Sequence, residues 1–179
     1  METEGSKSSS ITKVLTYKIK IAELALGFTT NSLINSAFDY LLYPFVIYQF
    51  GIVKGGIIMT FLSFIACIFI LKFYDWSKRD WLGIEAIKRL KGYKGSKKLG
   101  KVTAWFLNKS EPVIFLFLSI HHDPFITTAY LRKGAYNGMS RRDWKIFMGS
   151  LIIGNAYWTL ACYIGITLVE WGWKRIVGL

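Results

Sequence analysis

Two stretches of the chain are apolar over their whole length and carry no charge. Residues 55–71 are dominated by Ile, Phe and Leu, with Lys54 and Lys72 at their ends. Residues 146–169 are likewise free of charged side chains. Because about 20 apolar residues cross the hydrocarbon core of a bilayer, and lysines at the ends can reach the interfaces, we predict a firm transmembrane helix in each stretch.

Two further apolar stretches, residues 24–53 and 112–131, are interrupted by polar residues near their middle. Each holds a single acidic residue in its interior, Asp39 in the first and Asp123 in the second. Polar groups at membrane depth are typical of a broken or re-entrant helix that faces protein or water. Basic residues flank both ends of 112–131, which favours a hairpin that enters and returns on one side.

Short amphipathic and capping patterns lie between these stretches. Apolar residues recur every three positions from Trp81 to Leu90, with charged residues between them, which predicts a short helix on the membrane surface. Ser77 with Asp80, and Ser140 with Asp143, resemble capping boxes at helix starts. The fold we predict is an all-α integral membrane protein with two firm transmembrane helices, two broken or re-entrant segments and one amphipathic surface helix.

The composition agrees with a membrane protein. The 179 residues are 53% hydrophobic and 17% aromatic, and the net charge is +12. A chain this apolar favours a membrane over nucleic acid as the partner of its basic residues, and no nucleic-acid module is evident. We expect residues 1–11 to form a disordered cytoplasmic tail and residues 12–179 to form a single membrane domain.

A basic loop at residues 77–109 predicts the orientation. Only Asp80 and Glu85 oppose its ten cationic residues, which are Lys78, Arg79, Lys88, Arg89, Lys91, Lys94, Lys97, Lys98, Lys101 and Lys109. The positive-inside rule places this loop in the cytoplasm. Four lysines between positions 7 and 20 place the N-terminus there too. We therefore predict a multi-pass protein of the cell (inner) membrane.

The sequence His121-His122-Asp123-Pro124 admits three interpretations. Imidazoles and a carboxylate are metal ligands, but adjacent side chains rarely converge on one ion and the chain has no third histidine. Asp123 followed by Pro124 is also a normal helix start. Ionisable groups at membrane depth favour a third role, in binding a proton or an anion. We predict no metal and no cofactor.

The candidate site residues form two groups. Those expected to bind substrate or protons are Asp39, His121, His122, Asp123, Thr127 and Asn155. Those expected to attract anionic headgroups are Arg132, Lys133, Arg141 and Arg142. The sequence holds no catalytic triad, phosphate-binding loop or dinucleotide fingerprint, so we do not predict an enzyme.

Residues 102–165 resemble the DedA/VTT (SNARE-associated) family of small membrane proteins. The resembling elements are Trp105-Phe106, the Pro124 region, Gly134-Ala135, Met139, Phe147, Gly154-Asn155, Trp158 and Gly165. The resemblance implies a re-entrant hairpin and translocation of a phospholipid or a polyprenyl-phosphate lipid with proton coupling. Family members usually carry an arginine on each side of the hairpin proline, where this chain has His121 and Thr127.

Two functions from different classes remain open. The first is a transporter-like protein whose partners are membrane lipids with anionic headgroups. The second is a non-catalytic membrane scaffold or accessory subunit. A membrane-embedded metal hydrolase is a third reading, for which one histidine pair is a poor basis. Self-association into a homo-oligomer is compatible with each of them.

Overall fold

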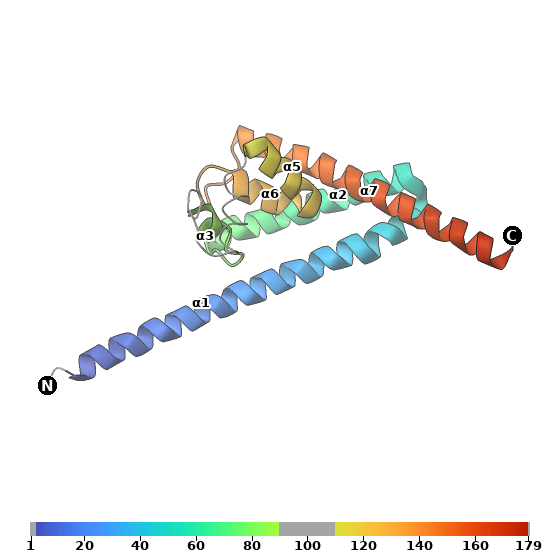
Figure 1. The fold of residues 1–179 in the computed structure, drawn as a ribbon. Helices are drawn as coiled ribbons and strands as arrows, with labels where there is room; N and C mark the ends of the chain where they lie inside the picture. Colours follow the sequence, from blue (N-terminus) through green and yellow to red (C-terminus); the bar gives the residue numbers. More distant parts are fainter. Residues whose placement is uncertain (1–2, 90–109, 179) are drawn as a thin grey trace.

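The computed structural model describes residues 3–89 and 110–178, with side chains from residue 19 onward except that of Arg89. The described residues form helices and no strand, as predicted (Figure 1). The elements are α1 (Thr3–Ala37), the π-helix η1 (Phe38–Leu42), α2 (Tyr43–Ser77), α3 (Ile84–Arg89), α5 (Glu111–His121), α6 (Pro124–Leu131) and α7 (Arg141–Val177).

Two stretches among the described residues are long and apolar enough to cross a membrane. They are Ile19–Ser77, with a mean hydropathy of 2.3 in its most apolar window, and Arg141–Val177, with 1.5. Only 17% and 11% of the residues in these windows are buried, whereas the core helix of a soluble protein would be mostly covered. Large exposed apolar surfaces are rare on soluble monomers, so the two helical stretches favour a membrane location.

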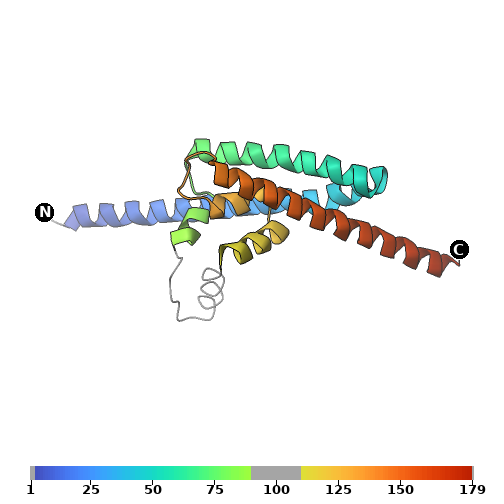
Figure 2. The same ribbon diagram turned by 90° about the horizontal axis from the view of Figure 1, so that it is seen from above.

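The first of these stretches turns back on itself at Gly51. This residue has φ 73° and ψ 172°, a conformation that interrupts α2 and that side chains with a Cβ rarely adopt. Val46 and Ile47, before the break, pack in one cluster with Met59 behind it. The rest of α2 then runs back along α7 (Figure 2). The predicted interruption of 24–53 is therefore a π-helix followed by a reversal at Gly51.

Helices α5 and α6 form a hairpin whose two ends meet. Arg142, at the start of α7, contacts the Glu111 carboxylate at 2.7 Å and the Leu131 carbonyl oxygen at 3.1 Å. Glu111 begins α5 and Leu131 ends α6, so both ends lie at the same end of the bundle. The 11 residues of α5 rise by about 16 Å, roughly half of the ~30 Å hydrocarbon thickness. This is the shape expected of a re-entrant segment.

The hairpin packs tightly on α7 through small residues. A Cβ added to Gly154 of α7 would lie 2.6 Å from the Ser119 carbonyl oxygen of α5. Gly154 therefore permits a backbone approach that no other residue allows without movement, as small residues do between membrane helices. The side chains of Ser119 and Ser150 are fully buried nearby.

The two predicted capping boxes have different outcomes. Ser140 and Asp143 form a complete box at the start of α7, which confirms that prediction. Ser77 ends α2 instead, and its hydroxyl donates to the Tyr74 carbonyl oxygen at 3.1 Å. The Asp80 carboxylate accepts from Ala86 N–H at 2.9 Å and so caps α3, which begins at Ile84, three residues later than the pattern predicts.

The N-terminal segment also differs from expectation. Helix α1 begins at Thr3, so residues 3–11 are helical in the structure rather than a disordered tail. The Glu23 carboxylate pairs with Arg79 at 3.1 Å, which places the middle of α1 beside the end of α2, while the N-terminal part of α1 extends beyond the other helices (Figure 1). Most of the basic loop lies outside the described residues.

An ion pair closes the same end of the bundle from inside. Arg132 Nη1 lies 2.7 Å from Asp75 Oδ1, and the Arg132 side chain is 1% exposed. The guanidinium also sits 5.6 Å from the centre of the Tyr74 ring. Arg132 was expected at the surface as a headgroup-attracting residue. It instead joins the hairpin to α2.

We predict that Arg132→Ala destabilises the protein strongly. The change leaves Asp75 without its cation, which costs about 3–5 kcal/mol for a buried pair and less here because Asp75 is 18% exposed. The matched control is Arg79→Ala, whose exposed pair with Glu23 is worth less than about 1 kcal/mol. Thermal unfolding in detergent measures both, and equal losses for the two variants would contradict the structural role of Arg132.

Candidate functional site

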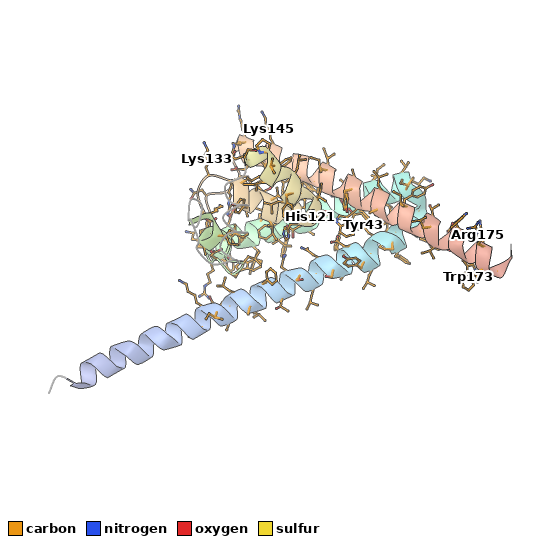
Figure 3. The ribbon with its side chains drawn as sticks, viewed as in Figure 1. Tyr43, His121, Lys133, Lys145, Trp173 and Arg175 are labelled. Carbon is orange, nitrogen blue, oxygen red and sulfur yellow. The ribbon has the colours of Figure 1, made fainter. Side chains whose placement is uncertain are left out.

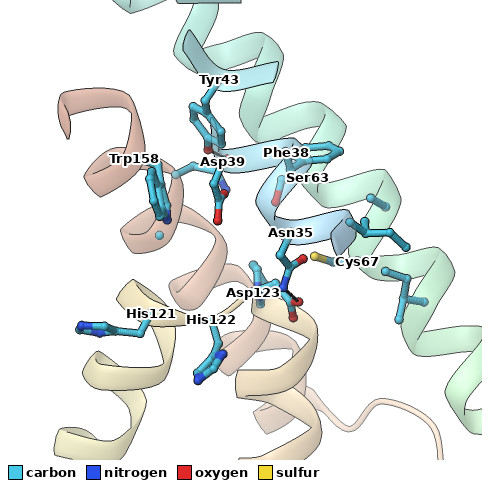
Figure 4. A pocket seen from close by; sticks show the side chains of 16 residues that line it. Asn35, Phe38, Asp39, Tyr43, Ser63, Cys67, His121, His122, Asp123 and Trp158 are labelled. Carbon is cyan, nitrogen blue, oxygen red and sulfur yellow. Dashed lines mark hydrogen bonds between the residues drawn. The ribbon is translucent and has the colours of Figure 1, made fainter. Parts of the chain in front are cut away.

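A cavity of about 100 Å³ lies where the broken helices meet (Figure 4). Its polar and ionisable lining comes from every long element of the bundle. These residues are Asn35 of α1, Asp39 of η1, Tyr43, Ser63 and Cys67 of α2, His121 of α5, His122 and Asp123 at the hairpin tip, and Asn155 and Trp158 of α7. A water needs about 10–15 Å³ of such volume, so the cavity holds several waters or one small polar group.

The cavity lies near half depth. Ser63 is midway between the break at Gly51 and the end of α2 at Ser77. The tip of the α5–α6 hairpin reaches the same level. His121 and Tyr43 lie between the end marked by Lys133 and the end marked by Arg175 (Figure 3). The cavity therefore lies midway along the part of α2 that follows Gly51.

The Asp123 carboxylate is held by two helices. It caps α6, because Oδ1 accepts from Ile126 N–H at 2.7 Å. Its other oxygen accepts from the Asn35 side-chain amide of α1 at 2.9 Å. The helix-start interpretation of the His-His-Asp-Pro sequence is therefore confirmed, and the same carboxylate also lines the cavity.

The Asp39 carboxylate is situated differently. It lies in the π-helical turn, a distortion that is frequent at functional sites. Within residues 19–88 and 110–178, no hydrogen bond or ion pair involves its side chain. Figure 4 shows it directed into the cavity, and its charge interacts with that of Asp123.

Asn155 connects α7 to the first half of the chain. Its side-chain oxygen accepts a short hydrogen bond from the Tyr43 hydroxyl, and its Nδ2 donates to the Leu151 carbonyl oxygen at 2.7 Å. These two hydrogen bonds fix the orientation of the Asn155 side-chain amide. The amide and Asp39 both line the cavity.

The two histidines line the rim and not the space between the carboxylates. The His121 ring stacks on Phe117 with 4.5 Å between ring centres, and its Nδ1 lies 3.1 Å from the Phe117 carbonyl oxygen. Figure 4 shows the rings of both His121 and His122 pointing away from Asp39. Among the described residues, no group of three or more His, Cys, Asp or Glu side chains is placed to hold a metal ion.

The structure brings together most of the residues predicted to bind substrate or protons. Asp39, His121, His122, Asp123 and Asn155 all line the cavity. Thr127 does not. Its side chain is fully buried, and its hydroxyl donates to the Asp123 carbonyl oxygen at 3.1 Å.

The residues predicted to attract headgroups divide in the same way. Lys133 and Arg141 are exposed at the end of the bundle that holds the hairpin mouth. Arg142 is half-buried in its contacts with Glu111 and Leu131, and Arg132 is buried against Asp75. Two of the four are therefore free to meet an anionic headgroup.

Some lining residues were not among the predicted ones. Asn35 precedes Asp39 by four positions, so helical spacing places both on one face of the first helix, and this signal was present in the sequence. Tyr43 follows Asp39 by four positions and shares this spacing, whereas Trp158 carries no such signal. Aromatic residues are abundant in membrane helices, and only the folded arrangement brings these two rings together, with 6.4 Å between their centres.

Comparisons with family models, curated proteins and solved structures find no match for this chain. The resemblance to the DedA/VTT family therefore depends on its sequence motifs.

We predict that Asp123→Ala and Asp123→Asn differ in stability. Alanine removes the cap of α6, at a cost of about 1 kcal/mol, and the bond to Asn35. Asparagine keeps an oxygen for Ile126 N–H, and rotation of the Asn35 amide restores the second bond. Thermal unfolding in detergent should therefore rank wild type and Asp123→Asn together above Asp123→Ala. Equal stability of the two variants would argue against the cap.

Proposed function

We propose that this chain is a multi-pass protein of the cell membrane that moves a phospholipid or similar amphiphile across the bilayer. In this arrangement the first helix, the part of α2 after Gly51, and α7 cross the membrane, and the α5–α6 hairpin is re-entrant. The N-terminus and the basic loop face the cytoplasm. The observation that carries the proposal is the polar cavity at half depth, where two helix interruptions meet, the π-helix and the hairpin tip.

Interrupted helices around a central polar site are a recurrent feature of transporters. The interruption frees backbone groups and places polar side chains where a continuous helix would present apolar ones. Here the π-helix carries Asp39 and the hairpin tip carries Asp123. A membrane anchor has no need of two carboxylates at this depth, where charge costs several kcal/mol.

An apolar groove next to the cavity favours an amphiphile over a purely polar substrate. It has a volume of about 640 Å³ and lies between α2 and α7, with Phe61, Phe64 and Leu160 among its lining residues. Asn155 lines both the groove and the cavity. A ligand with an acyl chain in the groove can therefore place a polar group beside Asn155.

The lining charges favour a phospholipid over a polyprenyl phosphate. Both acidic groups of the cavity, Asp39 and Asp123, repel a phosphate, and the described part of the lining contains no Lys or Arg. A phosphate is better accommodated by exposed Lys133 and Arg141 at the hairpin mouth. Proton binding by the two carboxylates is the proposed coupling, with His121, His122, Tyr43 and Cys67 as the other titratable groups of the lining.

A second candidate is a non-catalytic scaffold. The last part of α7 is apolar and exposed, with Leu168, Val169 and Trp171 each more than half exposed. Such a surface also suits contact with a partner helix in the membrane. The scaffold needs no polar cavity, and this difference makes the two candidates separable by changing the cavity alone.

We predict that purified protein in liposomes accelerates the transbilayer movement of phosphatidylethanolamine labelled on its acyl chain, and that an imposed pH gradient alters the rate. Asp39→Asn should reduce the rate by tenfold or more, because the amide cannot exchange a proton. Glu170→Gln, which removes an exposed carboxylate outside the cavity, is the matched control. Rates equal to those of protein-free liposomes would favour the scaffold.

We predict opposite accessibility for the two ends of the bundle. In a Cys67→Ala, Cys162→Ala background, Lys133→Cys lies at the hairpin mouth and Lys174→Cys at the far end of α7, both at exposed positions. A membrane-impermeant maleimide added to intact cells should label Lys174→Cys and leave Lys133→Cys unlabelled until the cells are lysed. Labelling of Lys133→Cys from outside would reverse the orientation.

A further inference from the structure

We propose that the cavity between Asp39 and Asp123 binds a primary ammonium group, carried by an amine-bearing phospholipid or by a free amine. The inference names the substrate class of the proposed transport, and it rests on that proposal only for the membrane setting. It is argued from the charge, the aromatic lining and the size of the cavity.

The negative charge of the cavity favours a bound cation. Two carboxylates face one small space, and their charges interact unfavourably. Asp123 has two hydrogen bonds from the protein, whereas the described residues provide none for Asp39. Like charges in apolar surroundings are stable only with a counter-ion or a proton. An ammonium group between them supplies the missing charge.

Aromatic rings form the wall on the α7 side. Trp158 lines the cavity, and Tyr40 and Tyr43 pack against its ring, with ring centres 5.8 and 6.4 Å away. The faces of Trp and Tyr rings attract organic cations. The Tyr43 hydroxyl is engaged with Asn155, so this contact fixes the tyrosine ring in place.

Size and hydrogen bonding favour a primary ammonium. A volume of about 100 Å³ admits an ammonium group with its first carbon atoms and excludes a whole lipid headgroup. Its three N–H groups match carboxylate oxygens of Asp39 and Asp123. A trimethylammonium group is larger and has no N–H to donate, so it would leave the Asp39 carboxylate without a hydrogen bond from the ligand.

The test compares lipids that differ only in the ammonium group. Full-length protein in detergent is equilibrated with equal amounts of phosphatidylethanolamine and phosphatidylcholine of the same acyl chains, and bound lipid is counted by native mass spectrometry. Calorimetric titration with ethylammonium chloride, against choline chloride and sodium chloride at equal ionic strength, tests the free amine. Asp39→Asn is the main variant, and Glu170→Gln is the matched control.

We expect wild type and Glu170→Gln to prefer phosphatidylethanolamine by on the order of tenfold, or ~1.4 kcal/mol. Asp39→Asn should lose the preference without a loss of thermal stability, since its side chain has no hydrogen bond in the described residues and its charge repels that of Asp123. Competition between ethylammonium and phosphatidylethanolamine assigns the site to the ammonium group from either source. Lipid preference without ethylammonium binding assigns it to the lipid headgroup.

Equal binding of the two lipids to wild type, or a preference that survives in Asp39→Asn, would overturn the inference. Sodium binding in place of ethylammonium would overturn it too, in favour of a metal cation. The failure of transport is a separate result. If the lipid preference holds in liposomes that show no translocation, the cavity is a lipid site of a scaffold. If translocation holds without a preference, the proposed function stands and the ammonium site falls.

Discussion

Two carboxylates placed within an apolar helix bundle are the constraint around which this structure is organised. An ionised carboxylate in hydrocarbon is costly, so each must be given donors, a counter-ion or a proton. Asp123 obtains its donors from a helix N-terminus, which exists only because the α5–α6 hairpin breaks there. It gains another from Asn35, which ties α1 to the hairpin tip. Asp39 has no equivalent support from residues 19–88 and 110–178, and it lies in the π-helix and lines the same cavity.

The remaining contacts hold the α5–α6 hairpin in the position that places Asp123 in the cavity lining. The pair of Arg132 with Asp75 and the contacts of Arg142 close the hairpin mouth at one end of α2 and α7. Gly154 then allows α5 to lie directly on α7 near the tip. Because both helices of the hairpin are short, their tip reaches half depth and no further. The ion pairs of Arg132 and Arg142 and the close contact at Gly154 therefore act together to position Asp123.

The sequence predicts the long helices well and the details of their ends less well. In a membrane, a single apolar segment such as 146–169 can satisfy its backbone hydrogen bonds internally as a helix. The sequence therefore predicts α7 directly. The sequence also predicts interruptions at Asp39 and Asp123. It does not predict their form, because a π-helical turn and a hairpin can each accommodate the same polar residues. Arg132 was misplaced because a basic residue after an apolar run looks the same whether it reaches out to lipid or back to Asp75. Trp158 was missed because its partner rings come from a distant helix.

A cavity that holds one cation also explains how transport would be coupled. Asp39 can bind a proton or pair with an ammonium group, and a proton on the carboxyl group removes the negative charge that holds the ammonium. Two ligands that exclude one another at one site drive each other off it, and this reciprocity needs no conformational signal between separate sites. A proton arriving from one side would release the amine, and an amine arriving from the other would release the proton. The unsupported carboxylate is thus better suited to exchange than Asp123, whose hydrogen bonds also serve the fold.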